Sequence, residues 1–250
     1  MPDSNDIKLR PLRLLLESIV FVWWYRARYL KSLAIPTLIL VVIWALSIVF
    51  QDQLTRFSRW SYWILYQVGF VFFAVACHRL VLLNESNQPL ASIFNKRAAI
   101  FLFWSFGILL SSVVMMGMLL NLLINVPGAV SLFKDHGNFF WIQVVTTLPA
   151  YYLIGRCILV LPATAIDEAI GLRESWQRTR GNGWKIVLII GIYPWIINVI
   201  LWLAAGDETT LFSYSLTAVL YYVGLALEVT ALSFVYKALV SETESDAQSD

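Results

Sequence analysis

Six long apolar stretches constrain this chain more than any other feature. A helix needs about 20 mostly apolar residues to cross roughly 30 Å of hydrocarbon. Stretches of this kind lie near residues 33–50, 60–83, 98–125, 139–166, 184–205 and 211–239. They predict an all-α integral membrane protein with six transmembrane helices in one polytopic domain, residues 1–240. The acidic, polar segment 241–250 is expected to be a disordered tail.

The composition excludes an ordinary soluble domain. Apolar residues make up 59% of the 250 and charged residues 14%, whereas globular chains have roughly 45–50% and about 25%. Aromatic residues, at 15%, are typical of chains whose rings settle at the membrane interface. The formal net charge is only +2, so nothing in the charge balance indicates a nucleic-acid partner.

The distribution of basic residues predicts the orientation. If the N-terminus is inside, fourteen of the 18 Lys and Arg residues fall in cytoplasmic segments. Three lie outside (Arg56, Arg59 and Lys134), and Arg156 lies within a span. Positive residues favour the cytoplasmic side, especially in short loops. Both termini are therefore expected to be cytoplasmic.

Three amphipathic segments, at 12–31, 86–97 and 168–180, precede pairs of spans. We expect them to form helices at the inner leaflet, with Trp176 buried and Arg173 and Arg178 solvated in the third. Trp24–Arg28 and Trp176–Arg180 share the pattern W-x-R-x-R. A threefold helix-plus-hairpin repeat is one interpretation. The other is that membrane hairpins in general carry aromatic and basic residues at their cytoplasmic start.

Two charged residues fall at membrane depth. Arg156 is about ten residues before the expected cytoplasmic end of the fourth span, and Glu228 is about nine residues before Lys237 at the end of the sixth. Charges at this depth usually face the bundle interior and find partners. We expect Arg156 and Glu228 to face one another as a structural pair. The alternatives are a substrate or proton path past both residues, or an Arg156 side chain that reaches the interface alone.

Four basic residues surround Gly181–Gly183: Arg173, Arg178, Arg180 and Lys185. Such a cluster attracts anionic headgroups of the inner leaflet, although ordinary membrane topology produces similar clusters. Asn182 is suited to cap the fifth span.

The sequence carries no pattern of known chemistry. It has no HExxH, phosphate-binding loop, GxSxG or Cys/His metal spacing, and its two histidines are expected on opposite sides of the membrane. We therefore expect no catalysis, no metal and no cofactor.

One stretch resembles a known family. Arg156, Leu159 and Pro162, then the acidic Asp167, match the first part of a pattern found in bacterial membrane proteins related to YciC. The second part, a-x-x-S-W-x-x-T-x-G-x-x-W, matches Leu172 to Trp184. A similar domain anchors some glycerophosphodiester phosphodiesterases. The resemblance, strong over about thirty residues, implies an inner-membrane helical bundle with a role in envelope or lipid homeostasis; without a phosphodiesterase domain, that activity is not implied.

Three functions follow as hypotheses, of which the weakest is a membrane enzyme that uses lipid headgroups. The first is a non-catalytic bacterial inner-membrane protein that binds lipid or a membrane-protein partner at its cytoplasmic face. The alternative is a small transporter or lipid flippase with a path near Arg156 and Glu228. A polar cavity that reaches both faces would favour transport, whereas a tightly packed bundle with an amphipathic collar would favour binding.

Overall fold

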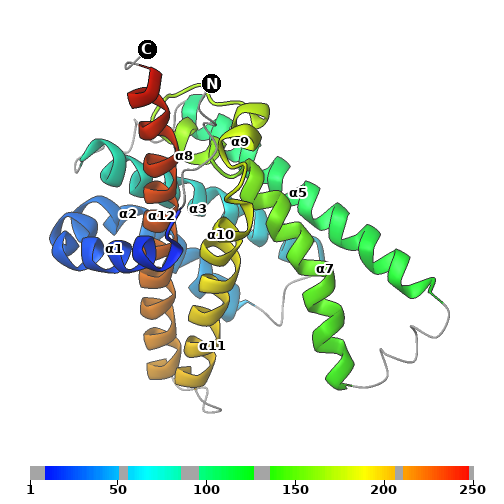
Figure 1. Cartoon of the computed structure of the whole chain (residues 1–250). Helices are drawn as coiled ribbons and strands as arrows, with labels where there is room; N and C mark the ends of the chain where they lie inside the picture. Colours follow the sequence, from blue (N-terminus) through cyan, green and yellow to red (C-terminus); the bar gives the residue numbers. More distant parts are fainter. Residues whose placement is uncertain (1–8, 51–55, 86–95, 127–135, 206–210, 248–250) are drawn as a thin grey trace.

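The computed structural model describes residues 9–50, 56–85, 96–126, 136–205 and 211–247, and contains no strand among them (Figure 1). The N-terminal half contains α1 (Pro11–Trp24), α2 (Arg26–Val49), α3 (Arg56–Leu83) and α5 (Lys96–Ile124). The C-terminal half contains α7 (His136–Cys157), α8 (Val160–Ala165), α9 (Leu172–Arg178), α10 (Gly183–Val187), the π-helical turn η1 (Leu188–Ile192), α11 (Tyr193–Ala205) and α12 (Leu211–Ala247). The predicted all-α class is confirmed.

Among the residues that the structure describes, four helical segments are long and apolar enough to cross a membrane: Arg26–Ser47, Ser61–Leu83, Lys96–Ile124 and Thr217–Val240. They lie within α2, α3, α5 and α12 and coincide with four of the six expected spans. Helices also occupy the other two expected spans, but in shorter pieces.

A proline lies at the break in each of these two spans, the fourth and the fifth. Proline has no backbone N–H, so a helix loses one hydrogen bond where proline follows. Pro162 leaves the Ile158 carbonyl without its usual donor, and that carbonyl instead accepts a hydrogen bond from Leu161 N at 3.1 Å. Helix α7 therefore ends at Cys157, and α8 begins at Val160. In the fifth expected span, η1 directly precedes Tyr193 and Pro194, as expected where a helix accommodates a missing donor.

Helices α3 and α12 form the centre of the molecule and are the most buried of the four long segments. Polar side chains join neighbouring helices there: Tyr29 Oη lies 2.6 Å from Thr230 Oγ1, and His78 Nδ1 lies 2.8 Å from Ser233 Oγ. Each of these polar groups is buried and has a partner, as interiors require. Helices α5 and α7 extend away from α12 as a second arm (Figure 1).

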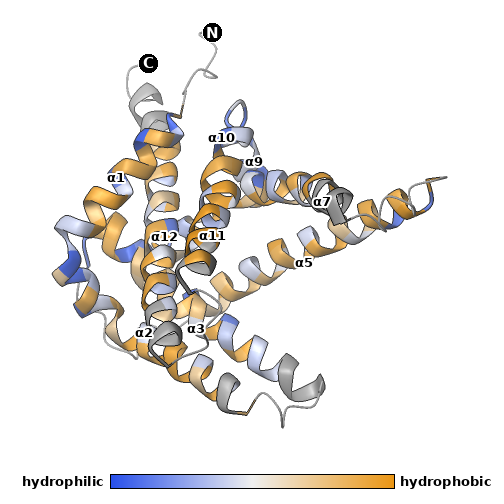
Figure 2. Ribbon diagram, turned by 90° about the horizontal axis from the view of Figure 1, so that it is seen from below, coloured by the Kyte–Doolittle hydropathy of each residue, from blue (hydrophilic) through white to orange (hydrophobic). Residues whose placement is uncertain are grey.

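Apolar residues make up much of the long helices (Figure 2), and many of them are exposed. Leu38 on α2, Phe103 on α5 and Ile200 on α11 are 61%, 69% and 57% exposed. Water-facing surfaces of soluble proteins rarely carry apolar patches of this extent, whereas hydrocarbon-facing surfaces require them.

Helix α12 continues to Ala247. It therefore includes most of the segment 241–250, which was predicted to be disordered, and residues 248–250 lie outside the described residues. Of the second amphipathic segment, 86–97, only Lys96 and Arg97 are described, as the start of α5.

Candidate functional site at the end of α7

The end of α7 is held by side chains of α9 and the residue after it. The carbonyl oxygen of Arg156 accepts a hydrogen bond from Ser175 Oγ at 2.9 Å. Thr179 Oγ1 lies 3.3 Å from the same oxygen but is closer to the Ser175 carbonyl, at 2.8 Å. Ser175 and Thr179 are fully buried. Carbonyls in the last turn of a helix lack partners within the helix, so the Ser175 hydroxyl group satisfies one of them, with the Thr179 hydroxyl group next to it. We call Arg156, Ser175, Trp176 and Thr179 the Arg156 junction.

The side chain of Arg156 also belongs to this junction. Its guanidinium lies 4.7 Å from the centroid of the Trp176 ring, and its Nη2 donates a hydrogen bond to the Trp176 carbonyl. Arg156 is only 5% exposed, and its Nε has no hydrogen-bond partner among the described residues. A cation over an aromatic face is stabilised most strongly when it is desolvated. Trp176 thus replaces the acidic partner that a buried arginine usually has.

The structure does not bring Arg156 and Glu228 together, and their predicted ion pair is absent from the described residues. The prediction placed Arg156 at membrane depth by counting residues back from Ile166, where the fourth span was expected to end. Because α7 ends at Cys157, Arg156 instead occupies the last helical turn and turns toward α9. A transport path that passes both residues loses its main support.

Glu228 lies inside α12 among tyrosines. Its charge acts on Tyr66 of α3, Tyr151 of α7 and Tyr193 of α11. Its carboxyl group makes no hydrogen bond or ion pair with another described residue. Glu228 is therefore an acid at membrane depth without a cationic partner in this part of the chain, which is energetically costly.

The segment between α9 and α10 permits a close approach of backbone to α7. Gly181 has φ 78°, a left-handed backbone conformation that residues other than glycine rarely adopt. A Cβ atom at Gly183 would lie 2.6 Å from Tyr152 Cε2. Tyr152 in turn packs against Trp184, with ring centroids 5.0 Å apart. Both glycines of this segment are therefore required by geometry.

Asn182 connects this segment to the N-terminus. Its Oδ1 accepts hydrogen bonds from Leu9 N at 3.2 Å and Lys185 Nζ at 3.0 Å. Asn182 is the N-cap residue of α10 but makes no side-chain capping hydrogen bond, so the expected capping role is wrong. Its amide instead fixes the start of α1 beside the Arg156 junction.

An ionic cluster lies between α8 and α9. Asp167, with φ 67°, forms ion pairs with Arg97 of α5 and Arg79 of α3. Arg79 also bonds the Ala165 carbonyl at 3.0 Å and Glu85 at 2.8 Å. The hydrogen bonds from Arg97 hold the pKa of the Asp167 carboxyl below its usual 3.8, against the opposing effect of burial. Asp167 thus joins three parts of the fold.

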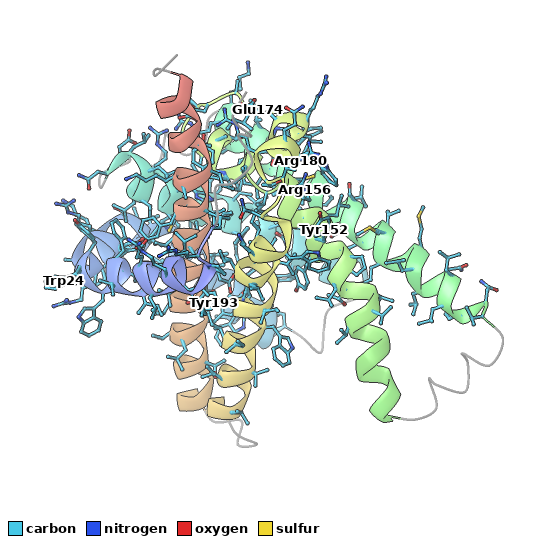
Figure 3. The ribbon with its side chains drawn as sticks, viewed as in Figure 1. Trp24, Tyr152, Arg156, Glu174, Arg180 and Tyr193 are labelled. Carbon is cyan, nitrogen blue, oxygen red and sulfur yellow. The ribbon has the colours of Figure 1, made fainter. Side chains whose placement is uncertain are left out.

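The four predicted basic residues differ in their surroundings. Arg178, which was expected to be solvated, pairs with Glu174 at 2.7 Å and its side chain is only 22% exposed, and Lys185 bonds Asn182. Arg173 and Arg180 are exposed and form no ion pair with another described residue. Figure 3 places Arg180, Glu174 and Arg156 at the same end of the molecule.

The predicted orientation of α9 needs a correction. Trp176 is 43% exposed, because the positions that face the protein are Ser175 and Thr179, one helical turn apart. Trp184 is 60% exposed. The outer surface of this region therefore combines two exposed cations with two exposed indoles; we call Arg173, Trp176, Arg180 and Trp184 the α9–α10 surface.

Among the described residues, no three His, Cys, Asp or Glu side chains are grouped to hold a metal ion. The contacts of the Arg156 junction pack α9 against α7, and the α9–α10 surface is free for contacts with other molecules. Tyr152, Ser175, Thr179 and Asn182 were not predicted as site residues, although Ser175 and Thr179 are positions of the family pattern and Asn182 was expected to cap a helix. Comparison with family models, curated proteins and solved structures finds no match to this chain. The resemblance to the YciC-related family stays a prediction.

Proposed function

We propose that this chain is a non-catalytic, six-span protein of the bacterial inner membrane that binds anionic lipid headgroups at its cytoplasmic face. The observation that carries this proposal is the α9–α10 surface, where Arg173, Trp176, Arg180 and Trp184 are all exposed within twelve residues of the sequence. Indole rings favour the headgroup region of a bilayer, and each basic residue near an anionic surface contributes about 1 kcal/mol. A role in envelope or lipid homeostasis, alone or with a membrane-protein partner, is consistent with such binding.

The anchoring of α9 and of the Trp176 ring supports specific binding rather than a general charge effect. Ser175 and Thr179 fix α9 to the Arg156 carbonyl, and the Arg156 guanidinium holds the Trp176 ring. A headgroup would therefore meet a Trp176 ring that Arg156 already holds, on a helix whose position is fixed. Less conformational entropy is lost on binding to a preorganised site.

Lipid retention tests this function. The purified protein in mild detergent is titrated with phosphatidylglycerol and phosphatidylcholine, and bound lipid is counted by native mass spectrometry. Replacing both Arg173 and Arg180 with Gln removes two charges and should weaken phosphatidylglycerol binding at least roughly tenfold. A matched control replaces Arg56 and Arg59, at the opposite end of α3 from Arg79, with Gln. Equal loss in both double variants, or none in the first, would refute the proposal.

Reporter fusions test the six spans and the orientation. A fusion after Lys237 should report a cytoplasmic position, and one within residues 127–138 an outside position. The fourteen-to-three excess of basic residues supports this arrangement. Opposite signals would place the α9–α10 surface on the wrong side of the membrane.

A further inference from the structure

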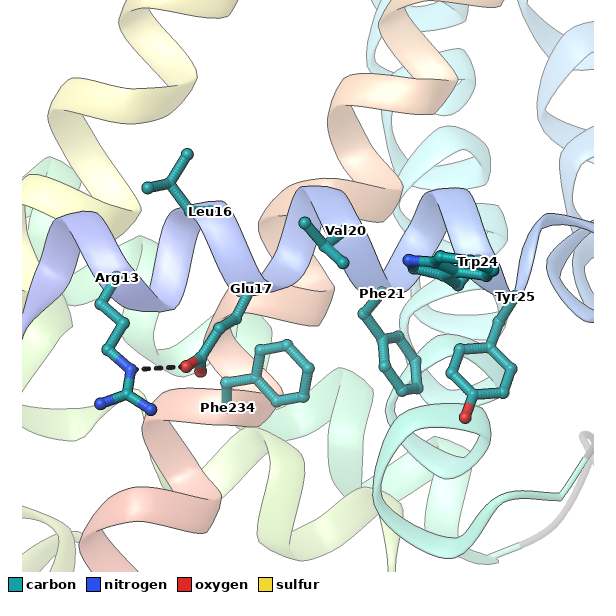
Figure 4. A pocket seen from close by; sticks show the side chains of 8 residues that line it. All are labelled: Arg13, Leu16, Glu17, Val20, Phe21, Trp24, Tyr25 and Phe234. Atoms are coloured by element: carbon teal, nitrogen blue, oxygen red, sulfur yellow. Dashed lines mark hydrogen bonds and ion pairs between the residues drawn. The ribbon is translucent and has the colours of Figure 1, made fainter.

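Helix α1 carries a groove on its outer side. The helix lies across α12 (Figure 1), and the groove beside it has a volume of about 680 Å³. Its polar and aromatic lining consists of Arg13, Glu17, Phe21, Trp24, Tyr25 and, from α12, Phe234 (Figure 4). The start of α1 lies near α10, because Leu9 N donates a hydrogen bond to Asn182 Oδ1; the groove extends from there to Trp24, on the side of the molecule away from Arg180 (Figure 3).

The polar part of the groove presents both signs of charge. Arg13 Nε donates to Glu17 Oε1 at 2.7 Å, and the two side chains are 69% and 44% exposed. This contact uses one of the five guanidinium donors and one carboxylate oxygen. The remaining donors of Arg13 fit a phosphate, and the remaining acceptor positions of Glu17 fit an ammonium group.

Aromatic rings follow Glu17 along the groove. The rings of Phe21 and Tyr25 have centroids 4.4 Å apart, and Phe234 meets Phe21 edge-on at 5.4 Å. Trp24 is 75% exposed, so its ring remains accessible. Aromatic faces attract organic ammonium groups through their quadrupole. Glu17 and these rings together favour a cation next to the phosphate-binding Arg13.

The other side of the groove is aliphatic. Leu16 and Val20 line it and are 63% and 52% exposed, and the neighbouring Leu12 is 76% exposed. These side chains lie one turn apart on α1 and form an apolar strip. A strip of this kind fits hydrocarbon chains and is unfavourable in water.

We propose that the α1 groove binds a zwitterionic phospholipid, with the phosphate on Arg13 and the ammonium group between Glu17 and the aromatic rings. The acyl chains then run along Leu16 and Val20. An anionic lipid is disfavoured, because its headgroup brings no cation to Glu17. This site goes beyond the proposed function: it takes a different headgroup class on a different helix, and shares with the α9–α10 surface only the membrane setting.

Native mass spectrometry with phosphatidylethanolamine, phosphatidylglycerol and uncharged diacylglycerol tests the site. Glu17→Gln should weaken phosphatidylethanolamine binding at least fivefold and leave phosphatidylglycerol binding unchanged. Arg13→Gln should weaken phosphatidylethanolamine binding similarly, and Trp24→Leu should weaken it while both charges remain. Glu174→Gln, which removes the acid of another i, i+4 ion pair outside the groove, is the matched control.

Two results would overturn the proposal. In the first, the wild-type protein binds diacylglycerol or phosphatidylglycerol at the groove as tightly as phosphatidylethanolamine. In the second, phosphatidylethanolamine binding is unchanged in both charge variants. Thermal unfolding of each variant in detergent confirms that the protein compared is folded. Replacing Arg173 and Arg180 should leave phosphatidylethanolamine binding intact, so failure of this site and failure of the proposed function give different patterns.

Discussion

Ser175 Oγ donates a hydrogen bond to the Arg156 carbonyl at 2.9 Å, and this contact fastens α9 to the end of α7. Both groups are buried, so a lost partner leaves the carbonyl without water as a substitute. A buried polar group without a partner costs about 1–3 kcal/mol. The contact therefore determines where α9 and its exposed cations lie.

Replacing the two junction hydroxyl groups should destabilise the protein. We expect Ser175→Ala together with Thr179→Val to lower the free energy of unfolding by about 2 kcal/mol. The measurement is thermal unfolding of detergent-purified protein. Ser111→Ala is the control, because that exposed hydroxyl bonds only Gly107 O within its own helix. A loss no greater than in the control would contradict the junction.

Gly183 should not tolerate a side chain. A methyl group there would meet Tyr152 Cε2 at 2.6 Å, and moving that ring disturbs its packing on Trp184. We expect Gly183→Ala to cost about 1–3 kcal/mol in stability. Gly107→Ala, where a Cβ atom meets no neighbour within 4 Å, should be neutral or stabilising in its helix. Equal stability of the two variants would show that α10 does not approach α7 this closely.

The ion pairs of Asp167 predict a pH dependence. The pKa of this carboxyl is lowered in the folded protein, chiefly by hydrogen bonds from Arg97. Its stabilising effect is therefore fully present above the unfolded pKa and is lost as pH falls through the folded value. Because Asp167 is 56% exposed, solvent screening keeps the effect small, below about 1 kcal/mol.

The test compares the melting temperature of wild type and Asp167→Asn from pH 3 to pH 7. The wild type should be more stable near neutral pH, and the difference should shrink as the pH falls below the usual carboxyl pKa. A difference that grows toward low pH would contradict the ion pairs.

Much of the fold follows from the sequence, because hydrocarbon thickness dictates the length of an apolar helix. The sequence did not reveal that α7 ends at Cys157, since Pro162 can kink a helix as well as break it. The prediction assumed one continuous helix to Ile166 and therefore placed Arg156 too far from the end of its helix. The α1 groove needs Phe234, more than 200 residues from α1 along the chain, and no local pattern predicts that contact.

Glu228 should destabilise the fold that contains it. Its carboxyl group has no ion pair among the described residues, and tyrosines of three helices surround it. We expect Glu228→Gln to raise stability by about 1 kcal/mol, or about 2–4 °C in melting temperature for a chain of this size. Glu174→Gln, which removes the acid of an existing pair, should not raise it. Destabilisation by Glu228→Gln would reveal a partner for this acid.

A double-mutant cycle tests most directly that Arg156 belongs to the junction with Trp176. The measurement is the free energy of unfolding, by SDS titration, of Arg156→Gln, Trp176→Leu, Glu228→Gln and the two double variants that contain Arg156→Gln. We predict a coupling free energy of about 1 kcal/mol between positions 156 and 176, and additive effects within roughly 0.5 kcal/mol between positions 156 and 228. Additive effects of 156 and 176, with strong coupling of 156 to 228, would contradict it.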